Sequence, residues 1–202
     1  MITIVDYGMG NVGSVFNMLR KLRAKVQISS DKNEIAKSDK LILPGVGHFD
    51  RGMDSLNSSG LATILTEHAL VNKKPILGIC LGMQMMTRGS EEGTQQGLGW
   101  VAANTIKFSP DNNLKIPHMG WNQVQSSIGA KLFESTPDEP ERFYFVHSYY
   151  VRADNSKDVA AYCHYGHDFV ASFAVDNIMG VQFHPEKSHL FGMNLFKRYI
   201  AL

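Results

Sequence analysis

A cysteine set between two glycines is the residue of this chain best suited to nucleophilic chemistry. Cys80 lies in the run GICLG (78–82), directly after the apolar segment Pro75–Ile79. This spacing of small residues is typical of a nucleophile elbow, a tight turn that joins a strand to a helix and presents the thiol beside the positive end of the helix, where thiolate is favoured. We predict Cys80 as a nucleophile, with the Leu81 N–H directed at a developing oxyanion. The alternative is a small buried residue at a strand end.

A histidine and a glutamate two residues apart follow another apolar run near the C-terminus. His184 and Glu186 flank Pro185 in QFHPE (182–186). Residues i and i+2 lie on one side of an extended segment, and a proline favours extended geometry in the residue before it. We therefore predict that Glu186 orients the imidazole and that His184 takes the thiol proton and later passes it to a leaving amine. A surface pair is the alternative, and His147, which also ends an apolar run, is the competing base.

Strands and helices alternate in the first half of the chain, which predicts a parallel sheet covered on both faces. The second half has apolar runs without helices between them, which indicates antiparallel hairpins added to the same sheet. The expected strands are Ile2–Val5, Val26–Ile28, Leu41–Leu43 (stopped by Pro44 and Gly45), Pro75–Ile79, Trp100–Phe108, Arg142–Val146, Val159–His164, Phe169–Phe173 and Ile178–Phe183. The expected helices are Asn11–Ala24, Leu61–Leu70 and Leu190–Ala201, the last with Leu190, Phe191, Leu195 and Ile200 facing the core.

The composition narrows the classes of protein that this chain can belong to. Its 202 residues suit one well-filled core without repeats or linkers, so a single domain over residues 1–202 is expected. The net charge of +1 and the lack of a long apolar run predict no nucleic-acid or membrane partner. Two cysteines exclude a disulfide scaffold and favour a cytoplasmic protein. No metal-binding spacing is present, and neither metal nor cofactor is expected. The histidines expected to be solvated or to cap helices are His48, His68, His164, His167 and His189.

These motifs and several other segments resemble the class I, or triad-type, glutamine amidotransferases. Within that family the resemblance is to the glutaminase subunits of imidazole glycerol phosphate synthases. It covers essentially the whole chain in the right order, and HMGWN (118–122) is its most specific part. The segments that carry it are DYGMGN (6–11), PGVG (44–47), GICLGMQ (78–84), PHMGWN (117–122), FVHSY (145–149) and HPE (184–186).

The resemblance implies a mostly parallel, doubly wound α/β sheet with an antiparallel extension, and a Cys80–His184–Glu186 triad. Cys80 would attack the side-chain carboxamide of glutamine, releasing ammonia and leaving a glutamyl thioester that water hydrolyses to glutamate. The oxyanion hole would combine the N–H of Leu81 with one from the loop around Val46 and Gly47 after a peptide rearrangement. The glycines on both sides of that valine make such a rearrangement inexpensive.

Further residues are implied to bind the substrate and a partner. Gln84 and Glu92 match positions that hold the substrate glutamine; packing of the helix and a solvated loop are their alternatives. The implied partner is a cyclase, a TIM-barrel synthase subunit that forms a heterodimer with the glutaminase and uses its ammonia to make imidazole glycerol phosphate and AICAR in histidine biosynthesis. The segment implied to grip the amino-acid end of the substrate is His147, Ser148 and Tyr149. The residues implied to face the partner are Trp121, Asn122 and Tyr144, although plain core packing stays open for the two aromatic residues.

Two segments depart from the histidine-pathway pattern. Residues 187–193 (KSHLFGM) are bulkier than expected, and residues 165–172 (YGHDFVAS) are closer to paralogues that occur with surface-polysaccharide genes. In those paralogues a similar glutaminase supplies ammonia to a sugar-modifying amidotransferase, so the final acceptor stays open. An unrelated thiol hydrolase of the α/β-hydrolase type would carry its acid well before the histidine. A silent scaffold that only binds its partner would not need an intact triad.

Overall fold

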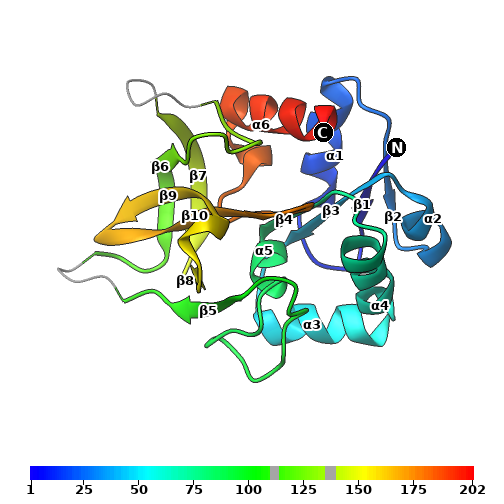
Figure 1. Ribbon diagram of the computed structural model, residues 1–202, viewed down its shortest axis with the longest axis horizontal. Coiled ribbons are helices and arrows are strands. Elements are labelled where there is room, and N and C mark those ends of the chain that lie inside the picture. The colour runs from blue at the N-terminus through cyan, green and yellow to red at the C-terminus, as the bar shows by residue number, and fades with distance from the viewer. Residues whose placement is uncertain (110–113, 135–139) are drawn as a thin grey trace.

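A mixed sheet of eleven strands forms the centre of the computed structural model, which describes residues 1–109, 114–134 and 140–202 (Figure 1). The strand order is β2-β1-β3-β4-β11-β10-β9-β6-β7, with β8 paired to β10 and to β5. The strands are β1 (Ile2–Val5), β2 (Val26–Ser29), β3 (Lys40–Gly45), β4 (Ile76–Cys80), β5 (Ala103–Lys107), β6 (His118–Ser126), β7 (Glu141–His147), β8 (Tyr149–Ala153), β9 (Val159–Tyr165), β10 (His167–Val175) and β11 (Ile178–Val181).

The sheet changes direction at β11. β2, β1, β3, β4 and β11 run parallel to one another, and the pairs from β11 through β10, β9, β6 and β7 are antiparallel. The predicted doubly wound α/β sheet with an antiparallel extension is therefore confirmed. Strand-helix connections produce the first part and hairpins the second, because parallel neighbours need a crossover and antiparallel neighbours do not.

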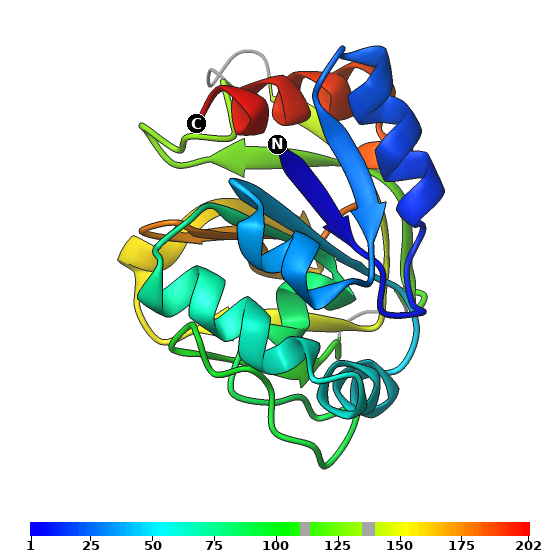
Figure 2. The same cartoon turned by 90° about the vertical axis from the view of Figure 1, so that its right-hand side faces the viewer.

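Helices cover both faces of the parallel part (Figure 1). Turned by 90°, the molecule shows α1 in blue beside α6 in red on one face (Figure 2). The α-helices are α1 (Val12–Lys21), α2 (Lys32–Lys37), α3 (Phe49–Ser58), α4 (Leu61–Thr66), α5 (Leu81–Met85) and α6 (His189–Ala201), and the short helices of other types are η1 (Glu67–Val71), η2 (Ser156–Asp158) and η3 (Pro185–Lys187). Within the described ranges, no helix combines the length and the apolar character that crossing a membrane requires.

Several elements differ from the sequence-based expectation. α2 and α3 were not expected. α2 buries only Ile35, so its signal is weak, but the buried residues of α3 (Phe49, Gly52, Met53 and Leu56) recur at helical spacing and could have predicted it. β6 and β8 were also missed; β6 is half exposed and gives a weak apolar signal. β3 continues through Pro44 to Gly45, where its register with β4 still holds, so these two residues do not stop it.

The last helix is rotated relative to the predicted core face. Leu195 is buried as expected, whereas Leu190 is 63% exposed, so its prediction as a core residue was wrong. A Cβ at Gly192 would lie 1.8 Å from the Pro185 carbonyl oxygen. The Gly192 side of α6 therefore packs directly against η3. The other buried residues of α6 are Gly192, Phe196 and Tyr199.

Candidate functional site

Cys80 stands in a strained turn at the end of β4. Its φ of +54° is unusual for a residue with a side chain, and α5 begins directly after it. The glycines on both sides are required by space. A Cβ at Gly78 would lie 2.7 Å from the Met83 amide nitrogen, and one at Gly82 would lie 1.8 Å from the Leu43 carbonyl oxygen. The elbow geometry expected from the spacing is therefore present.

His184 lies at the same edge of the sheet and is fixed by its neighbours. Its Nδ1 donates to Glu186 Oε1 at 2.7 Å, and both side chains are 2% exposed. Its backbone N–H donates to the Tyr144 carbonyl at 2.9 Å, which ties this turn to β7. His184 is extended, as expected before a proline, but residues 185–187 form the 3₁₀ turn η3. Glu186 therefore reaches the imidazole from a turn and not along an extended segment, which corrects the predicted geometry.

The imidazole of His184 interacts with two acidic groups. Burial by itself lowers the pKa of His184, but its interactions with Cys80 and Glu186 outweigh burial and raise the pKa to about 10. Because Nδ1 donates to Glu186, Nε2 is the nitrogen available for the thiol. Nε2 is buried, and Cys80 is the first of the two groups that raise the pKa of His184. The pair is suited to an imidazolium–thiolate state.

A pocket of about 360 Å³ opens in front of Cys80 and His184. Every residue that was predicted for the oxyanion hole or for glutamine binding lines it, which brings together segments from β3, α5 and the β7–β8 connection. Its volume suits a ligand of amino-acid size. The lining residues are Val46, Gly47, Cys80, Leu81, Gln84, Glu92, Pro117, Val146, His147, Ser148, Tyr149 and His184.

A family model described as "Glutamine amidotransferase class-I" matches residues 3–200 of this chain. The chain belongs to this family. It is 48% identical over 202 residues to "Imidazole glycerol phosphate synthase subunit HisH 2" of Pseudomonas aeruginosa, with all of both chains covered. It is 52% identical over 200 residues to the protein of the same name from Methanococcus maripaludis, with 99% of this chain and 98% of that one covered.

A solved structure described as a glutamine amidotransferase has the same fold. Its TM-score is 0.76 at 15% identity, over 99% of this chain and 97% of the other. Together with the family model, this likeness identifies the mixed sheet as the class I glutamine amidotransferase fold. In this fold the ends of β3, β4 and β11 lie side by side. The loops that follow these three strands carry the pocket.

His147, the competing base, has both ring nitrogens occupied in this amidotransferase. Nδ1 lies 2.8 Å from the Tyr149 carbonyl oxygen, which only accepts, so Nδ1 carries the proton. Nε2 then accepts from Nδ1 of His118 at 2.8 Å. Burial lowers the pKa of His147 to about 3 and that of His118 to about 4. A buried histidine with both nitrogens engaged and a low pKa is a weak base, which favours His184 for that role.

The loop predicted to form the oxyanion hole is held from both sides. Gly45 pairs with Cys80 in the β3–β4 register, and a Cβ there would lie 2.7 Å from the Tyr7 hydroxyl. That hydroxyl donates to the Pro44 carbonyl at 2.8 Å, and burial, followed by the charge of Cys80, raises the pKa of Tyr7 far above its usual value. Beyond this brace, Gly47 has a φ of +107°. The fixed part of the loop therefore ends directly before the peptide that would turn.

Glu92 has a structural contact in addition to its place in the pocket. Its Oε2 accepts from the Phe49 N–H at 2.8 Å, at the start of α3. Asp50, the next residue, accepts from the backbone N–H groups of Thr94 and Gln95. The loop around Glu92 is thus tied to α3, which argues against a freely solvated loop.

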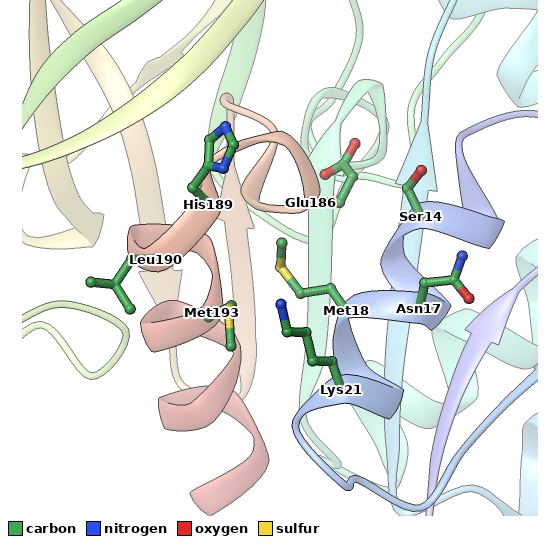
Figure 3. A pocket seen from close by; sticks show the side chains of 8 residues that line it. All are labelled: Ser14, Asn17, Met18, Lys21, Glu186, His189, Leu190 and Met193. Atoms are coloured by element: carbon green, nitrogen blue, oxygen red, sulfur yellow. The ribbon is translucent and has the colours of Figure 1, made fainter.

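The residues predicted to face a partner lie outside the pocket on β6 and β7. Trp121 and Tyr144 are cross-strand neighbours with ring centroids 6.4 Å apart, and Trp121 also stacks on His189. Trp121 is 42% exposed, so core packing does not explain it. A groove of about 520 Å³ lies nearby between α1 and α6, and Figure 3 shows Glu186 at its head.

Three residues near the site were not singled out from the sequence. Gln182 contacts Cys80, His118 supports His147, and Tyr7 braces the oxyanion-hole loop. A polar residue at the end of an apolar strand was a signal for Gln182, whereas His118 begins the half-exposed strand β6 and carried no such signal. The expectation for His68 was wrong: it is 1% exposed, because α4 continues into η1 and turns it inward. His48 caps α3 as expected. The described residues contain no group of three or more side chains arranged to hold a metal ion.

Proposed function

We propose that this chain is the glutaminase subunit of an imidazole glycerol phosphate synthase in histidine biosynthesis. One observation carries the proposal. A buried His184–Glu186 pair and the strained Cys80 flank one small pocket, in a chain about half identical over its full length to proteins of that name. The names of these relatives favour the histidine pathway over the surface-polysaccharide alternative. Glu186 follows His184 by two residues. An unrelated thiol hydrolase of the α/β-hydrolase type would carry its acid well before the histidine, so this order argues against that class.

The proposed reaction proceeds through a thioester. The Cys80 thiolate attacks the carboxamide carbon of glutamine, and His184 gives its proton to the departing nitrogen as the C–N bond breaks. Ammonia leaves, and His184 then takes a proton from the water that attacks the thioester, which releases glutamate and restores the thiolate. The N–H of Leu81 and one from Val46 or Gly47 stabilise the oxyanion in both halves of the reaction.

The pocket walls supply polar groups for the rest of the substrate. We assign Gln84 and Glu92 to the substrate glutamine and residues 147–149 to its amino-acid end. A carboxylate on one side suits the substrate ammonium, and backbone groups of the β7–β8 connection suit its carboxylate. Since one oxygen of Glu92 already accepts from Phe49 N–H, the other is the one assigned to the substrate.

The proposed partner is a TIM-barrel cyclase that binds over the pocket mouth and receives the ammonia. The support is a set of exposed apolar side chains on β6 and α6, since exposed apolar surface can mark an interaction site. Met119 is 61% exposed, Trp121 42% and Leu190 63%. We propose a cytoplasmic heterodimer, because a reducing compartment suits a reaction that depends on a free thiol.

The test is to mix the chain with a candidate cyclase, its acceptor nucleotide and glutamine labelled with ¹⁵N in the amide. We expect the label in imidazole glycerol phosphate. Cys80→Ala in the same complex should transfer nitrogen from added ammonium salt but not from glutamine. Label that reaches only a sugar acceptor would overturn the histidine-pathway assignment, and glutamine hydrolysis by Cys80→Ala would overturn the assigned nucleophile.

A further inference from the structure

A buried glutamine lies beside Cys80 in the sheet. β4 and β11 run parallel with Ile79 opposite Val181, so the next pair along, Cys80 and Gln182, are neighbours. Gln182 is 0% exposed, and its backbone N–H donates to the Ala171 carbonyl at 2.9 Å. Its side-chain Nε2 lies 3.7 Å from Cys80 Sγ, within hydrogen-bond distance for sulfur. The steps of the proposed reaction do not use this contact.

An acceptor-only group fixes the direction of the Gln182 amide. Gln84 Nε2 lies 3.0 Å from the Tyr149 carbonyl oxygen, so Gln84 must present its NH₂ group there. The same nitrogen lies 3.0 Å from the side-chain oxygen of Gln182, which accepts its second N–H. Gln182 therefore turns its own NH₂ group toward the sulfur. The reversed amide would oppose two NH₂ groups and would aim a carbonyl oxygen at the thiolate.

The Tyr149 carbonyl is held in turn by a second chain of hydrogen bonds. It accepts from His147 Nδ1 at 2.8 Å, and His147 accepts from His118. Nε2 of His118 accepts from the side chain of Asn122 at 3.2 Å, and Asn122 also donates to the His164 carbonyl at 2.9 Å. A carbonyl oxygen, which can only accept, stands at each end of this series of hydrogen bonds. The two carbonyl oxygens determine which nitrogen of each side chain donates. The orientation of Gln182 thus depends on a connected network and not on one contact.

We propose that Gln182 stabilises the Cys80 thiolate by donating its side-chain N–H to the sulfur, with Gln84 as the positioning residue that sets the direction of this donor. The proposal rests on Cys80 being the nucleophile of the proposed reaction. A hydrogen bond to an ionised acceptor is stronger than one to a neutral group. The N–H therefore favours the charged sulfur before attack on glutamine and again when the thioester is hydrolysed. It also makes the sulfur a better leaving group in that second step.

The test follows the alkylation of Cys80 by iodoacetamide as a function of pH, which requires neither glutamine nor a partner. All variants carry Cys163→Ala, so that Cys80 is the only thiol. Gln182→Met keeps the shape of the side chain but removes the donor, whereas Gln182→Glu keeps an acceptor for Gln84 and places an oxygen at the sulfur. Ser172→Ala is the matched control, since this buried hydroxyl donates to the Gly180 carbonyl on β11 and not to Cys80.

We expect the midpoint of the alkylation profile to move to higher pH in Gln182→Met, with a rate near pH 7 lower by about tenfold or more. Gln182→Glu should be slower still, Ser172→Ala unchanged, and all should reach the same plateau at high pH, where the thiol is ionised without help. If Gln182→Met does not fold, Gln182→Leu takes its place, because it also removes the donor and adds no charge.

A Gln182→Met profile that superimposes on that of the parent would overturn the proposal, as would a lower plateau with an unchanged midpoint, which would mean that Gln182 only packs. The two proposals are tested separately. A shifted profile in a protein that does not hydrolyse glutamine would leave the role of Gln182 standing and remove the glutaminase assignment.

Discussion

At the scale of single residues, the two cysteines differ in what surrounds them. Cys80 lines the pocket beside His184, whereas Cys163 is 3% exposed in β9, where burial and the nearby Asp168 raise its pKa to about 12. We expect Cys80→Ala to abolish glutamine hydrolysis, since the proposed nucleophile is lost, and Cys163→Ala to retain it within about twofold. Glutamate release by the two purified variants is the measurement. An inactive but folded Cys163→Ala would count against the assignment.

The roles of the two pocket histidines can be separated by kinetics. His184→Ala should lower kcat by at least about 100-fold, because the proton shuttle is lost. His147→Ala should mainly raise KM, because both nitrogens of this residue already bond to the protein and its proposed role is to hold the substrate. Steady-state rates over a range of glutamine concentrations distinguish the two outcomes. If His147→Ala gave the larger loss of kcat, the two roles would have to be exchanged.

Glu186 is expected to matter less than His184. In Glu186→Gln the amide oxygen can still accept from Nδ1 of His184, but the negative charge that helps to raise the pKa of His184 is lost. We expect a loss of kcat smaller than in His184→Ala, together with an activity profile displaced along the pH axis. Measuring kcat between pH 6 and 10 tests this. Equal losses in the two variants would mean that Glu186 has a larger part than orienting the imidazole.

Buried neutral histidines should make the fold sensitive to mild acid. The pKa values of His147 and His118 lie below that of an unfolded histidine, near 6.5, so the unfolded state binds more protons as the pH falls below 6.5. Between pH 6.5 and 5 each should reduce the free energy of unfolding by at most about 2 kcal/mol. His184 does not add to this loss: its raised pKa keeps it protonated in the folded state, so its contribution to stability is nearly complete at pH 6.5 and rises slightly as the unfolded histidine gains its proton.

Urea unfolding at pH 7.5 and pH 5 measures this loss of stability. His118→Gln should lose less stability between the two values than the parent. His164→Gln is the matched control, because His164 is exposed and bonds to Asp168 on the surface. An equal loss in all three proteins would show that the buried histidines are not the cause.

At the scale of elements, the turn around Cys80 packs β4 and α5 against β3. Its glycines lie so close to neighbouring backbone atoms that a side chain there would have no space. We expect Gly82→Ala to destabilise the protein by about 3 kcal/mol or more, because its Cβ would overlap the Leu43 carbonyl on the neighbouring strand. Gly13→Ala in α1 is the matched control: its Cβ meets nothing within 4 Å, so the change should stabilise by up to about 1 kcal/mol. Thermal unfolding of both variants tests the contrast, and a Gly82→Ala protein as stable as the parent would contradict it.

At the scale of the whole molecule, the proposed function requires a partner to control the site. In the proposed mechanism the peptide beyond the fixed end of β3 turns, and partner binding favours the state with its N–H inward. Each 1.4 kcal/mol of such bias raises a rare active state about tenfold. We therefore expect the isolated chain to be a poor glutaminase that a cyclase with bound acceptor stimulates by about 100-fold or more. Equal turnover alone and in the complex would contradict this coupling.

A substitution of Trp121, on the surface proposed to face the partner, separates partner binding from the chemistry of the site. Trp121→Ala should reduce stimulation by about tenfold or more, because a half-exposed tryptophan at an interface is a common hot spot. Hydrolysis by the isolated chain should change by no more than about twofold, since Trp121 does not line the pocket. Glutamine turnover with and without the partner gives both numbers. An equal drop in both would place Trp121 in the chemistry and not in docking.

Local stereochemistry made several features predictable from the sequence. The elbow around Cys80 follows from glycine spacing: a side chain at Gly78 would meet Met83 and Gly82 within the turn itself, whereas one at Gly82 would meet Leu43 on the neighbouring strand β3. The parallel strands of the first half follow from apolar runs that alternate with amphipathic segments. Shorter or half-exposed elements such as α2 and β6 carry too few buried residues for a periodic signal, so they were missed.

Contacts between distant segments were decided by the tertiary structure alone. Gln182 lies next to Cys80 because β11 pairs with β4, and the hydrogen bond from His118 to His147 exists because β6 pairs with β7. Glu186 reaches His184 from a 3₁₀ turn, which the packing of Gly192 against Pro185 accompanies. The spacing of residues in a sequence shows which side of an element they occupy. It does not show which strand becomes the neighbour, because that depends on how all the elements bury their apolar faces together.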